Sequence, residues 1–272
     1  MAPALEALRG WFAGVPAVAV ACSGGVDSLL LATVAHRTSP ASTLVVHSVT
    51  PAVPAAATAR VLALAADEGW RLRLVRSREF EDERYLANPR DRCYSCKSHL
   101  YDAITGLADV VDGRTTLLSG ANLDDLAEYR PGLVAAAEHG VRHPYVEVGM
   151  AKADVRRVAA ELGLDCADLP ASPCLASRLY TGTAVTPLRL RAVEVGEALL
   201  TARTGVAVVR CRIRGDAVRV EVPDADRAAV TDAALADVLA AMRALAPDLR
   251  AAVLDDEAYR PGRAFVLTPV AR

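Results

Sequence analysis

The sequence predicts an α/β protein with a parallel sheet, followed by a smaller α+β domain. Short apolar runs alternate with helical segments through the first part of the chain, and a glycine-rich turn joins the first run to the first helix. Later in the chain, two consecutive strands follow a helix. Strands separated by helices imply right-handed crossovers and a parallel sheet. A chain of 272 residues is long enough for two domains, which we place at residues 1–180 and 181–272.

The strands of the first domain are expected in its apolar runs, at Ala17–Cys22, Thr43–Ser48, Arg71–Val75 and Thr116–Ser119. Its helices are expected at Ser28–Arg37, Pro54–Asp67, Cys93 to about Leu107, a short segment after Pro131-Gly132, and Lys152–Leu162. Pro54 suits the first turn of the second helix and Gly69 suits its end. The polar interval from Ser77 to Arg92 carries no clear pattern.

The second domain follows a loop rich in proline. We expect a helix, two strands, helical segments and two short strands, at Pro187–Thr201, Val206–Arg212, Ala217–Val222, Ala225–Leu245 and around Ala252 and Phe265. The dipeptide Gly215-Asp216 between the first two strands is typical of a hairpin turn.

A phosphate-binding loop is predicted at Ser23-Gly24-Gly25-Val26-Asp27-Ser28, between the first strand and the first helix. Backbone N–H groups and the helix dipole favour an anion there, and the glycines let the backbone approach it closely. The hydroxyls of Ser23 and Ser28 can add donors, and Asp27 can hold Mg²⁺ beside the phosphates. The loop matches neither a Walker motif nor G-x-G-x-x-G.

Further polar residues follow the strand Thr116–Ser119, in Gly120-Ala121-Asn122-Leu123-Asp124-Asp125. Ligands of parallel sheets bind at the carboxyl ends of the strands. We therefore expect Asn122 and Asp124 to face the same nucleotide crevice as the phosphate loop.

Composition limits the classes of partner and compartment. The formal net charge is −2, the pI is near 6.2, and no block of Lys and Arg stands out, so a strong nucleic-acid signal is missing. No uncharged apolar run approaches the ~20 residues of a membrane-spanning helix. The N-terminus lacks the basic segment and apolar core of a secretory signal. We expect a cytoplasmic protein with no membrane partner.

Three cysteines carry candidate chemistry. Cys93 and Cys96 form a C-x-x-C at a helix start, where the dipole favours the thiolate. Cys174 lies in a proline-bounded loop beside Arg178, which can stabilise a thiolate or a phosphate. The three thiols could bind one iron–sulfur cluster with one iron open, or a zinc site with His99 as fourth ligand. The remaining cysteines, Cys22, Cys166 and Cys211, are expected to be inert and buried.

These motifs together resemble the LarE family of ATP-dependent pyridinium-carboxylate sulfur transferases, within the N-type ATP pyrophosphatase superfamily. The resemblance rests on Ser23–Ser28, Arg92–Lys97, Gly120–Asp125, Tyr129–Gly132, Cys174–Arg178 with Gly182-Thr183, and the pattern of Arg210, Arg212, Arg219 and Glu221. It covers most of residues 15–190 and continues to about Glu221. It implies an adenine nucleotide α-hydrolase-like first domain.

The resemblance also implies a two-step reaction with ATP and Mg²⁺. A substrate carboxylate is adenylated with loss of pyrophosphate (PPi), and a sulfur then displaces AMP. The acceptor would be pyridinium-3,5-dicarboxylate mononucleotide, a small molecule, in the biosynthesis of the nickel-pincer cofactor. Its phosphate needs a cationic clamp, for which Arg210 and Arg212, with Glu221 beside them, are the candidates. Arg210 and Arg212 could equally be exposed strand arginines.

Family members differ in the source of the sulfur. Some sacrifice the cysteine that corresponds to Cys174, and others use a [4Fe–4S] cluster held with an extra C-x-x-C. Because this sequence has Cys93 and Cys96, we expect the cluster, with Cys174 as third ligand and as a catalytic residue together with Asp27 and Arg178. The family also forms symmetric homo-oligomers.

Three other functions share part of this pattern. A tRNA thiolase would use the same loop and cysteine chemistry, but the acidic balance disfavours it. An amidating synthetase that uses ammonia would not need the three cysteines. A nucleotide-binding module without catalysis has no use for a thiolate near the phosphate loop.

Overall fold

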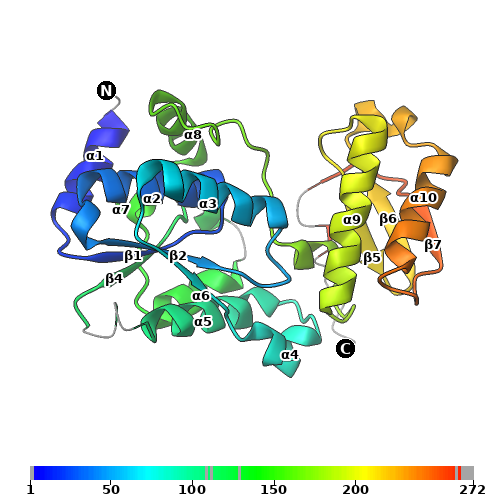
Figure 1. The fold of residues 1–272 in the computed structure, drawn as a ribbon, viewed down its shortest axis with the longest axis horizontal. Helices are drawn as coiled ribbons and strands as arrows, with labels where there is room; N and C mark the ends of the chain where they lie inside the picture. Colours follow the sequence, from blue (N-terminus) through cyan, green and yellow to red (C-terminus); the bar gives the residue numbers. More distant parts are fainter. Residues whose placement is uncertain (1–2, 108–109, 111–112, 128–129, 261–262, 265–272) are drawn as a thin grey trace. The chain divides into compact units, whose positions relative to one another are not determined.

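The computed structural model describes residues 3–107, 110, 113–127, 130–260 and 263–264, in two compact units (Figure 1). The first unit comprises Met1–Glu79 and Cys93–Ser172, and the second comprises Phe80–Arg92 and Pro173–Arg272. The division after Ser172 falls before the boundary placed at residue 180. Phe80–Arg92 joins the second unit because Asn88 Nδ2 donates to the carbonyl oxygens of Tyr180 at 2.9 Å and Thr183 at 2.8 Å.

The sheet of the first unit is parallel throughout, as the alternation of strands and helices predicts. Its strands are β1 (Val18–Ala21), β2 (Thr43–Ser48), β3 (Leu72–Val75) and β4 (Thr116–Ser119), in the order β3-β2-β1-β4. The chain runs from β1 outward to β3 and then returns to the other side of β1. This reversal makes the carboxyl ends of β1 and β4 the position where α/β sheets bind ligands.

Helices cover both faces of this sheet. The first face carries α1 (Pro3–Ala13), α2 (Val26–Thr38), α3 (Ala55–Glu68) and α8 (Lys152–Glu161), and the second carries α5 (Arg92–Thr105) and α6 (Pro131–Glu138), as Figure 1 shows. Side chains alternate along β1: Val18 and Val20 belong to the apolar cluster of the first face, and Ala19 and Ala21 to that of the second.

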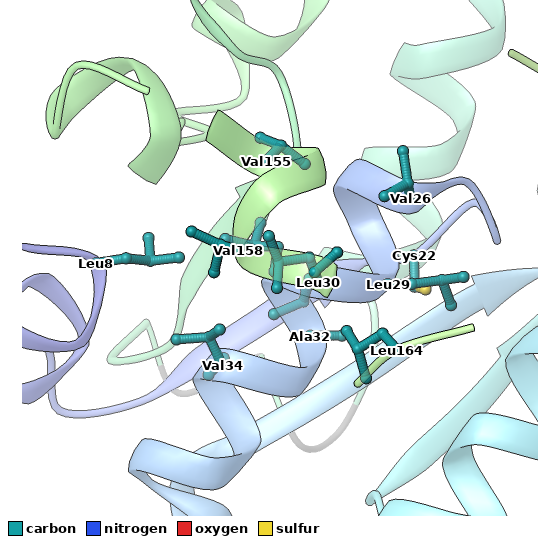
Figure 2. Packing of buried hydrophobic residues seen from close by; sticks show 14 of the residues in the cluster. Leu8, Cys22, Val26, Leu29, Leu30, Ala32, Val34, Val155, Val158 and Leu164 are labelled. Atoms are coloured by element: carbon teal, nitrogen blue, oxygen red, sulfur yellow. The ribbon is translucent and has the colours of Figure 1, made fainter. Parts of the chain in front are cut away.

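Helix α2 is almost completely buried, which holds its N-terminus in a fixed position. Leu29, Leu30 and Leu31 are each at most 1% exposed. Figure 2 shows Leu30 packed among Leu8 of α1 and Val158 of α8. A core that surrounds a helix on several sides leaves little freedom for its first turn. The phosphate loop is therefore anchored by the packing of the helix that follows it.

The remaining elements of the first part of the chain are short. They are the α-helices α4 (Glu83–Leu86) and α7 (Pro144–Glu147) and the 3₁₀ turns η1 (Pro40–Ser42), η2 (Glu79–Glu81) and η3 (Leu123–Ala127). Part of the patternless interval from Ser77 to Arg92 is thus helical. Asp82 caps α4, since its carboxylate accepts from the Arg84 N–H at 2.9 Å.

The second unit is the α+β arrangement that the sequence predicts. It contains η4 (Leu175–Arg178), α9 (Pro187–Thr204), β5 (Arg210–Arg214), β6 (Ala217–Glu221), η5 (Asp224–Ala229), α10 (Asp232–Arg243) and β7 (Ala251–Leu254). Strands β5 and β6 form the expected hairpin, with φ of +62° at Gly215, and β7 pairs parallel to β6. The expected strand near Val206 begins only at Arg210, and Phe265 lies outside the described residues.

In the part of the chain that the structure describes, no helix combines the length and the apolar character needed to cross a membrane.

Candidate functional site

The phosphate loop lies between β1 and α2, where the sequence analysis places it. Ser28 Oγ organises the loop: it accepts from the Ser23 N–H at 3.0 Å and donates to the Gly25 carbonyl at 3.1 Å. Gly25 is the N-cap of α2 and supplies no side-chain cap in the described structure. The first N–H groups of α2 are then suited to an anion, as at other helix N-termini. Ser23 is exposed and can add its hydroxyl to the same site.

Helix α3 fixes the outer side of this loop. Gly24 has φ of +80°, and a Cβ there would lie 2.6 Å from the Ala57 carbonyl oxygen. Arg60 Nε donates to the Gly24 carbonyl at 3.1 Å. Only glycine fits position 24, for both the backbone conformation and the space.

Asp27 is the centre of the site in the first unit. Its Oδ1 accepts from Asn122 Nδ2 at 3.1 Å, its Oδ2 pairs with Lys152 Nζ, and its carbonyl accepts from the Tyr145 hydroxyl at 2.8 Å. Gly120 packs against the same residue, because a Cβ on Gly120 would lie 3.2 Å from the Asp27 Cβ. Three segments distant in sequence thus converge on one residue, and two of them reach its carboxylate.

Asn122 and Asp124 both lie at this point, after β4. Asn122 is 3% exposed, and its Oδ1 accepts from the Asp124 N–H at 3.0 Å. Asp124 is exposed, and its Oδ2 accepts from the Lys152 N–H at 3.0 Å. Asp124 therefore holds the start of α8 in place, and its exposed carboxylate can also meet a ligand.

Lys152 is a site residue that the sequence analysis did not single out. It is the first residue of α8, and its side chain is 33% exposed. A lysine at a helix start opposes the helix dipole, and this is the signal that could have marked it. Its ammonium group reaches a phosphate loop that lies more than a hundred residues earlier in the chain.

His47 lies buried at the end of β2, beside the loop. Its Nδ1 is 2.8 Å from the Cys22 carbonyl oxygen and its Nε2 is 2.9 Å from Thr58 Oγ1. A carbonyl only accepts, so Nδ1 carries the proton and Nε2 of the neutral ring accepts from the Thr58 hydroxyl. Burial lowers the pKa of His47, although the hydrogen bond to Cys22 raises it. A neutral His47 thus connects β1, β2 and α3 behind the phosphate loop.

Cys93 and Cys96 lie one turn apart in the first turns of α5, both partly exposed. Residues at this spacing share a helix face, which suits two thiolate ligands of one metal centre. Among the described residues, no set of three or more His, Cys, Asp or Glu side chains is gathered as a metal site, and His99 does not complete one with the pair. The pair supplies two ligands, and a cluster or zinc needs others.

Cys174, the predicted third ligand, belongs to the second unit and precedes η4. It is partly exposed, and no cysteine of the described chain forms a disulfide. Arg178 shapes the Cys174 loop: its Nη1 donates to the carbonyls of Pro173 at 2.7 Å and Cys174 at 3.2 Å. The thiol thus sits on a loop held by a buried cation.

Glu197 of α9 in turn holds Arg178 and was not singled out from the sequence. Its carboxylate accepts from Arg178 Nε at 3.0 Å and Nη2 at 3.1 Å, and also from the Cys211 N–H at 3.1 Å. Burial lowers the pKa of Arg178, but Glu197 raises it and the net shift is upward. Arg178 is therefore committed to shaping the loop beside Cys174.

Arg212 and Glu221 form a buried ion pair across the β5–β6 hairpin. Arg212 Nε is 2.7 Å from Glu221 Oε2, and the two residues are 3% and 0% exposed. Arg212 also donates to the carbonyls of Ser177 at 3.0 Å and Arg260 at 3.2 Å. Burial raises the pKa of Glu221, against the lowering by Arg212 and Arg263. Arg212 is thus not the exposed strand arginine that the sequence left open.

Arg210 occupies a different environment in the same unit. Its guanidinium lies over the Tyr259 ring, 5.1 Å from the centroid, and its Nη1 donates to the Val209 carbonyl at 2.7 Å. Burial lowers the pKa of Arg210, and the positive charge of Arg178 lowers it further. Glu197 and Tyr259 raise it, but the net shift is downward.

The three other cysteines are buried, as the sequence predicts. Burial raises the pKa of Cys22 to about 11 and raises the pKa of Cys166 and Cys211 as well. Thiols that stay protonated are poor nucleophiles and poor ligands.

No family model matches the chain, but individual proteins do. It is 38% identical over 219 residues to the protein slr1717 of Synechocystis, and the aligned region covers 80% of this chain and 81% of that protein. It is 34% identical over 144 residues to the pyridinium-3,5-bisthiocarboxylic acid mononucleotide synthase of Lactiplantibacillus plantarum, across 53% of this chain and 51% of the synthase. The chain belongs to the LarE family.

The superfamily is supported by a further relative. The tRNA(Ile)-lysidine synthase of Nocardia farcinica is 33% identical over 223 residues, across 74% of this chain and 65% of that synthase. The parallel sheet with its Ser23–Ser28 loop is the fold of the N-type ATP pyrophosphatases, to which the family belongs. Two of these relatives are named as synthases, which supports the prediction that this chain is an enzyme.

Proposed function

We propose that the chain is an ATP-dependent sulfur transferase that acts on a pyridinium carboxylate in nickel-pincer cofactor biosynthesis. The observation that carries the proposal is the convergence of the phosphate loop, Asn122 and Lys152 on Asp27. The synthase of Lactiplantibacillus plantarum supports the substrate, because its name describes a thiolated pyridinium mononucleotide.

In the first step, the acceptor carboxylate attacks the α-phosphate of ATP, and PPi leaves. The first N–H groups of α2 and the Ser23 hydroxyl would hold the phosphates, and Lys152 would place its positive charge against them. Asp27 is the residue that would hold Mg²⁺. That ion would neutralise charge on the phosphates when bound. The products of this step are an acyl-adenylate and PPi.

In the second unit, Arg210 is the stronger candidate for the acceptor's phosphate. Its lowered pKa indicates an environment that an anion would relieve. Arg212 and Glu221 are already paired with each other, so their proposed contribution is to hold β5 and the Ser177 carbonyl in place.

For the sulfur, we propose that Cys93, Cys96 and Cys174 hold a [4Fe–4S] cluster with one iron open. Such a cluster, when bound, would carry an additional sulfide as the transferable atom. The chain's contribution is three thiolates, two of them on one face of α5. The alternative is that Cys174 gives up its own sulfur and becomes dehydroalanine.

We also propose a homo-oligomer, as in the family. The second unit exposes Leu188 of α9 and Val253 of β7, at 58% and 41%. Apolar side chains of this kind suit an interface between copies. Light scattering of the purified chain tests this, and a monomer at all concentrations would contradict it.

The function is tested by measuring PPi release with a panel of acceptors. Pyridinium-3,5-dicarboxylate mononucleotide should stimulate release and gain sulfur in place of oxygen when sulfide is supplied. Stimulation by tRNA instead would favour a tRNA-modifying enzyme, and stimulation by ammonia alone would favour an amidating synthetase.

The sulfur source is tested by anaerobic reconstitution with iron and sulfide. Visible absorption, metal analysis and more than one turnover, each lost on replacing any of the three cysteines, would support the cluster. A colourless protein whose Cys174 becomes dehydroalanine after one transfer would support the sacrificial alternative.

A further inference from the structure

His143 lies at the same carboxyl edge of the sheet as the phosphate loop. A short parallel bridge between Leu118 and Arg142 extends the sheet beside β4. It is closed by the Ser119 N–H donating to the Arg142 carbonyl at 3.1 Å and the Arg142 N–H donating to the Leu117 carbonyl at 2.9 Å. Because the added segment runs parallel to β4, His143 follows it at the edge where ligands bind.

The ring of His143 is held at one nitrogen only. Its Nδ1 is 2.9 Å from Ser119 Oγ, and the residue is partly buried. Among the residues that the structure describes, Nε2 has no hydrogen-bond partner. His47 and His139 differ, since both ring nitrogens of each are bonded. His143 is thus oriented through Nδ1 while Nε2 stays available.

Hydrogen bonds and one electrostatic interaction couple His143 to the nucleotide site. The Asn122 N–H donates to Asp125 Oδ2 at 3.0 Å, and the Asn122 side chain holds Asp27. The Asp125 carboxylate acts on His143 through its charge. The Lys97 ammonium of α5 also acts on His143, and α5 carries Cys93 and Cys96. The charges that act on His143 therefore come both from the segment that holds Asp27 and from the helix that carries the predicted sulfur ligands of this unit.

The charges around His143 leave it neutral at neutral pH. Burial lowers its pKa most, and the positive charge of Lys97 adds to the lowering. The contact with Ser119 and the carboxylates of Glu147 and Asp125 raise it, but the net shift is downward. These are the charged groups that act on the ring from α5, η3 and its own segment. A neutral imidazole with one open nitrogen is equipped to accept a proton.

We propose that His143 is a catalytic base of the sulfur-transfer step, a role that rests on the proposed function. The nucleophile is a hydrosulfide or thiol. Its sulfur forms a bond to the acyl carbon, and the bond from that carbon to the AMP oxygen breaks, with AMP taking the electron pair. The sulfur proton passes to His143 Nε2 and then to solvent. In this role Nδ1 carries the proton and donates to Ser119 Oγ, which leaves the lone pair on Nε2.

The test compares His143→Asn with the wild type in two assays on the same preparation. Asparagine keeps a polar group near the Nδ1 position, for Ser119, and removes the titratable nitrogen. The first-turnover burst of PPi with ATP and the pyridinium acceptor, measured without sulfide, reports adenylation alone, which is not assigned to His143. It should be unchanged, which also reports an intact fold. Formation of thiolated product from added sulfide in a single turnover should fall about 100-fold.

The pH profile separates a base from a structural residue. The wild-type transfer rate should fall as pH drops below the pKa of His143, because the protonated ring cannot accept, and this limb should be absent in His143→Asn. His139→Asn, a control at the C-cap of α6, should behave as wild type. A variant with wild-type transfer and profile, or with equal loss of PPi release, would overturn the inference. A wild-type chain that makes no thiolated product would overturn the proposed function as well.

Discussion

Lys152 Nζ pairs with Asp27 Oδ2, so the first residue of α8 neutralises the carboxylate proposed to hold Mg²⁺. The other oxygen of that carboxylate accepts from Asn122. A magnesium ion would have to share Asp27 with Lys152 or displace it. Lys152 would then turn toward the phosphates, where its charge serves the developing PPi.

Replacing Lys152 with Ala should reduce PPi release at least 100-fold and leave stability nearly unchanged. The pair is partly exposed, and such ion pairs contribute about 1 kcal/mol or less. Thermal melting and PPi release measure the two effects. Lys152→Arg, which keeps the charge, should retain more activity than Lys152→Ala. Equal activity in Lys152→Ala and the wild type would remove Lys152 from the site.

Asp27→Asn should abolish PPi release while the chain stays folded. The substitution preserves the shape of the side chain and its place beside Asn122 but removes the negative charge for Mg²⁺. Isothermal titration with Mg²⁺ and a non-hydrolysable ATP analogue measures the loss of metal-dependent affinity. Unchanged Mg²⁺ dependence in the variant would show that Asp27 does not hold the ion.

Gly24 and Gly25 should respond very differently to alanine. Gly24→Ala places a Cβ 2.6 Å from the Ala57 carbonyl at a φ of +80°, so the loop must move and ATP affinity should fall. In Gly25→Ala the nearest atom to the new Cβ is Ser23 Oγ, at 3.8 Å, and the backbone is extended. The affinity of Gly25→Ala for ATP should be close to that of the wild type. Equal effects of the two substitutions would contradict the loop geometry.

Acid should destabilise the first unit through His47. Its pKa in the folded chain is lowered from the ordinary 6.5, so the unfolded chain binds the proton more readily. The contribution of neutral His47 to stability is present above about pH 6.5. It is lost as pH falls through the lowered folded pKa. Denaturant unfolding from pH 8 to pH 5 should show a smaller decline for His47→Asn, and His139→Asn should decline as the wild type does.

Breaking the buried pair of the second unit should be costly. Arg212→Ala leaves Glu221 buried and partly uncompensated, and removal of one partner of such a pair typically costs about 3–5 kcal/mol. The double variant Arg212→Met with Glu221→Gln should recover much of that loss. The acceptor assay then separates stability from binding. A folded double variant that still binds the pyridinium acceptor would assign the phosphate clamp to Arg210.

The parallel sheet and the loop could be predicted because their signals are local. Each strand is a short apolar run, and Ser23–Ser28 fixes the turn and the helix N-terminus within six residues. All β1 residues are buried, whichever face of the sheet they point to, because helices cover both faces. A strand of this kind is a continuous apolar run in the sequence.

The convergence on Asp27 could be predicted only in part. Asn122 and Asp124 follow a strand, so their place at the carboxyl edge follows from parallel topology. Lys152 follows a loop, and the residues next to it in the sequence do not indicate which strand end its side chain will reach. The membership of Phe80–Arg92 in the second unit depends on the Asn88 amide finding carbonyls some ninety positions later, a contact with no local signal.

The burial of charged residues in the β5–β6 hairpin could not be predicted from the sequence either. Alternation along a strand predicts two faces but not which face is buried. Both faces of β5 are buried here, with Cys211 and Ile213 on one face and Arg212 on the other, where Arg212 pairs with Glu221. A sequence pattern of charged residues in a strand would ordinarily indicate the exposed side.

The central claim is that the acceptor carboxylate is adenylated before sulfur enters, and labelled oxygen tests it most directly. The acceptor is prepared with heavy oxygen in its carboxylates and incubated with ATP, Mg²⁺, sulfide and the chain, and the products are weighed by mass spectrometry. The account predicts that AMP carries one labelled oxygen for each sulfur that the acceptor gains, and that PPi carries none. Unlabelled AMP, or thiolated acceptor formed with ADP and phosphate as the nucleotide products, would contradict it.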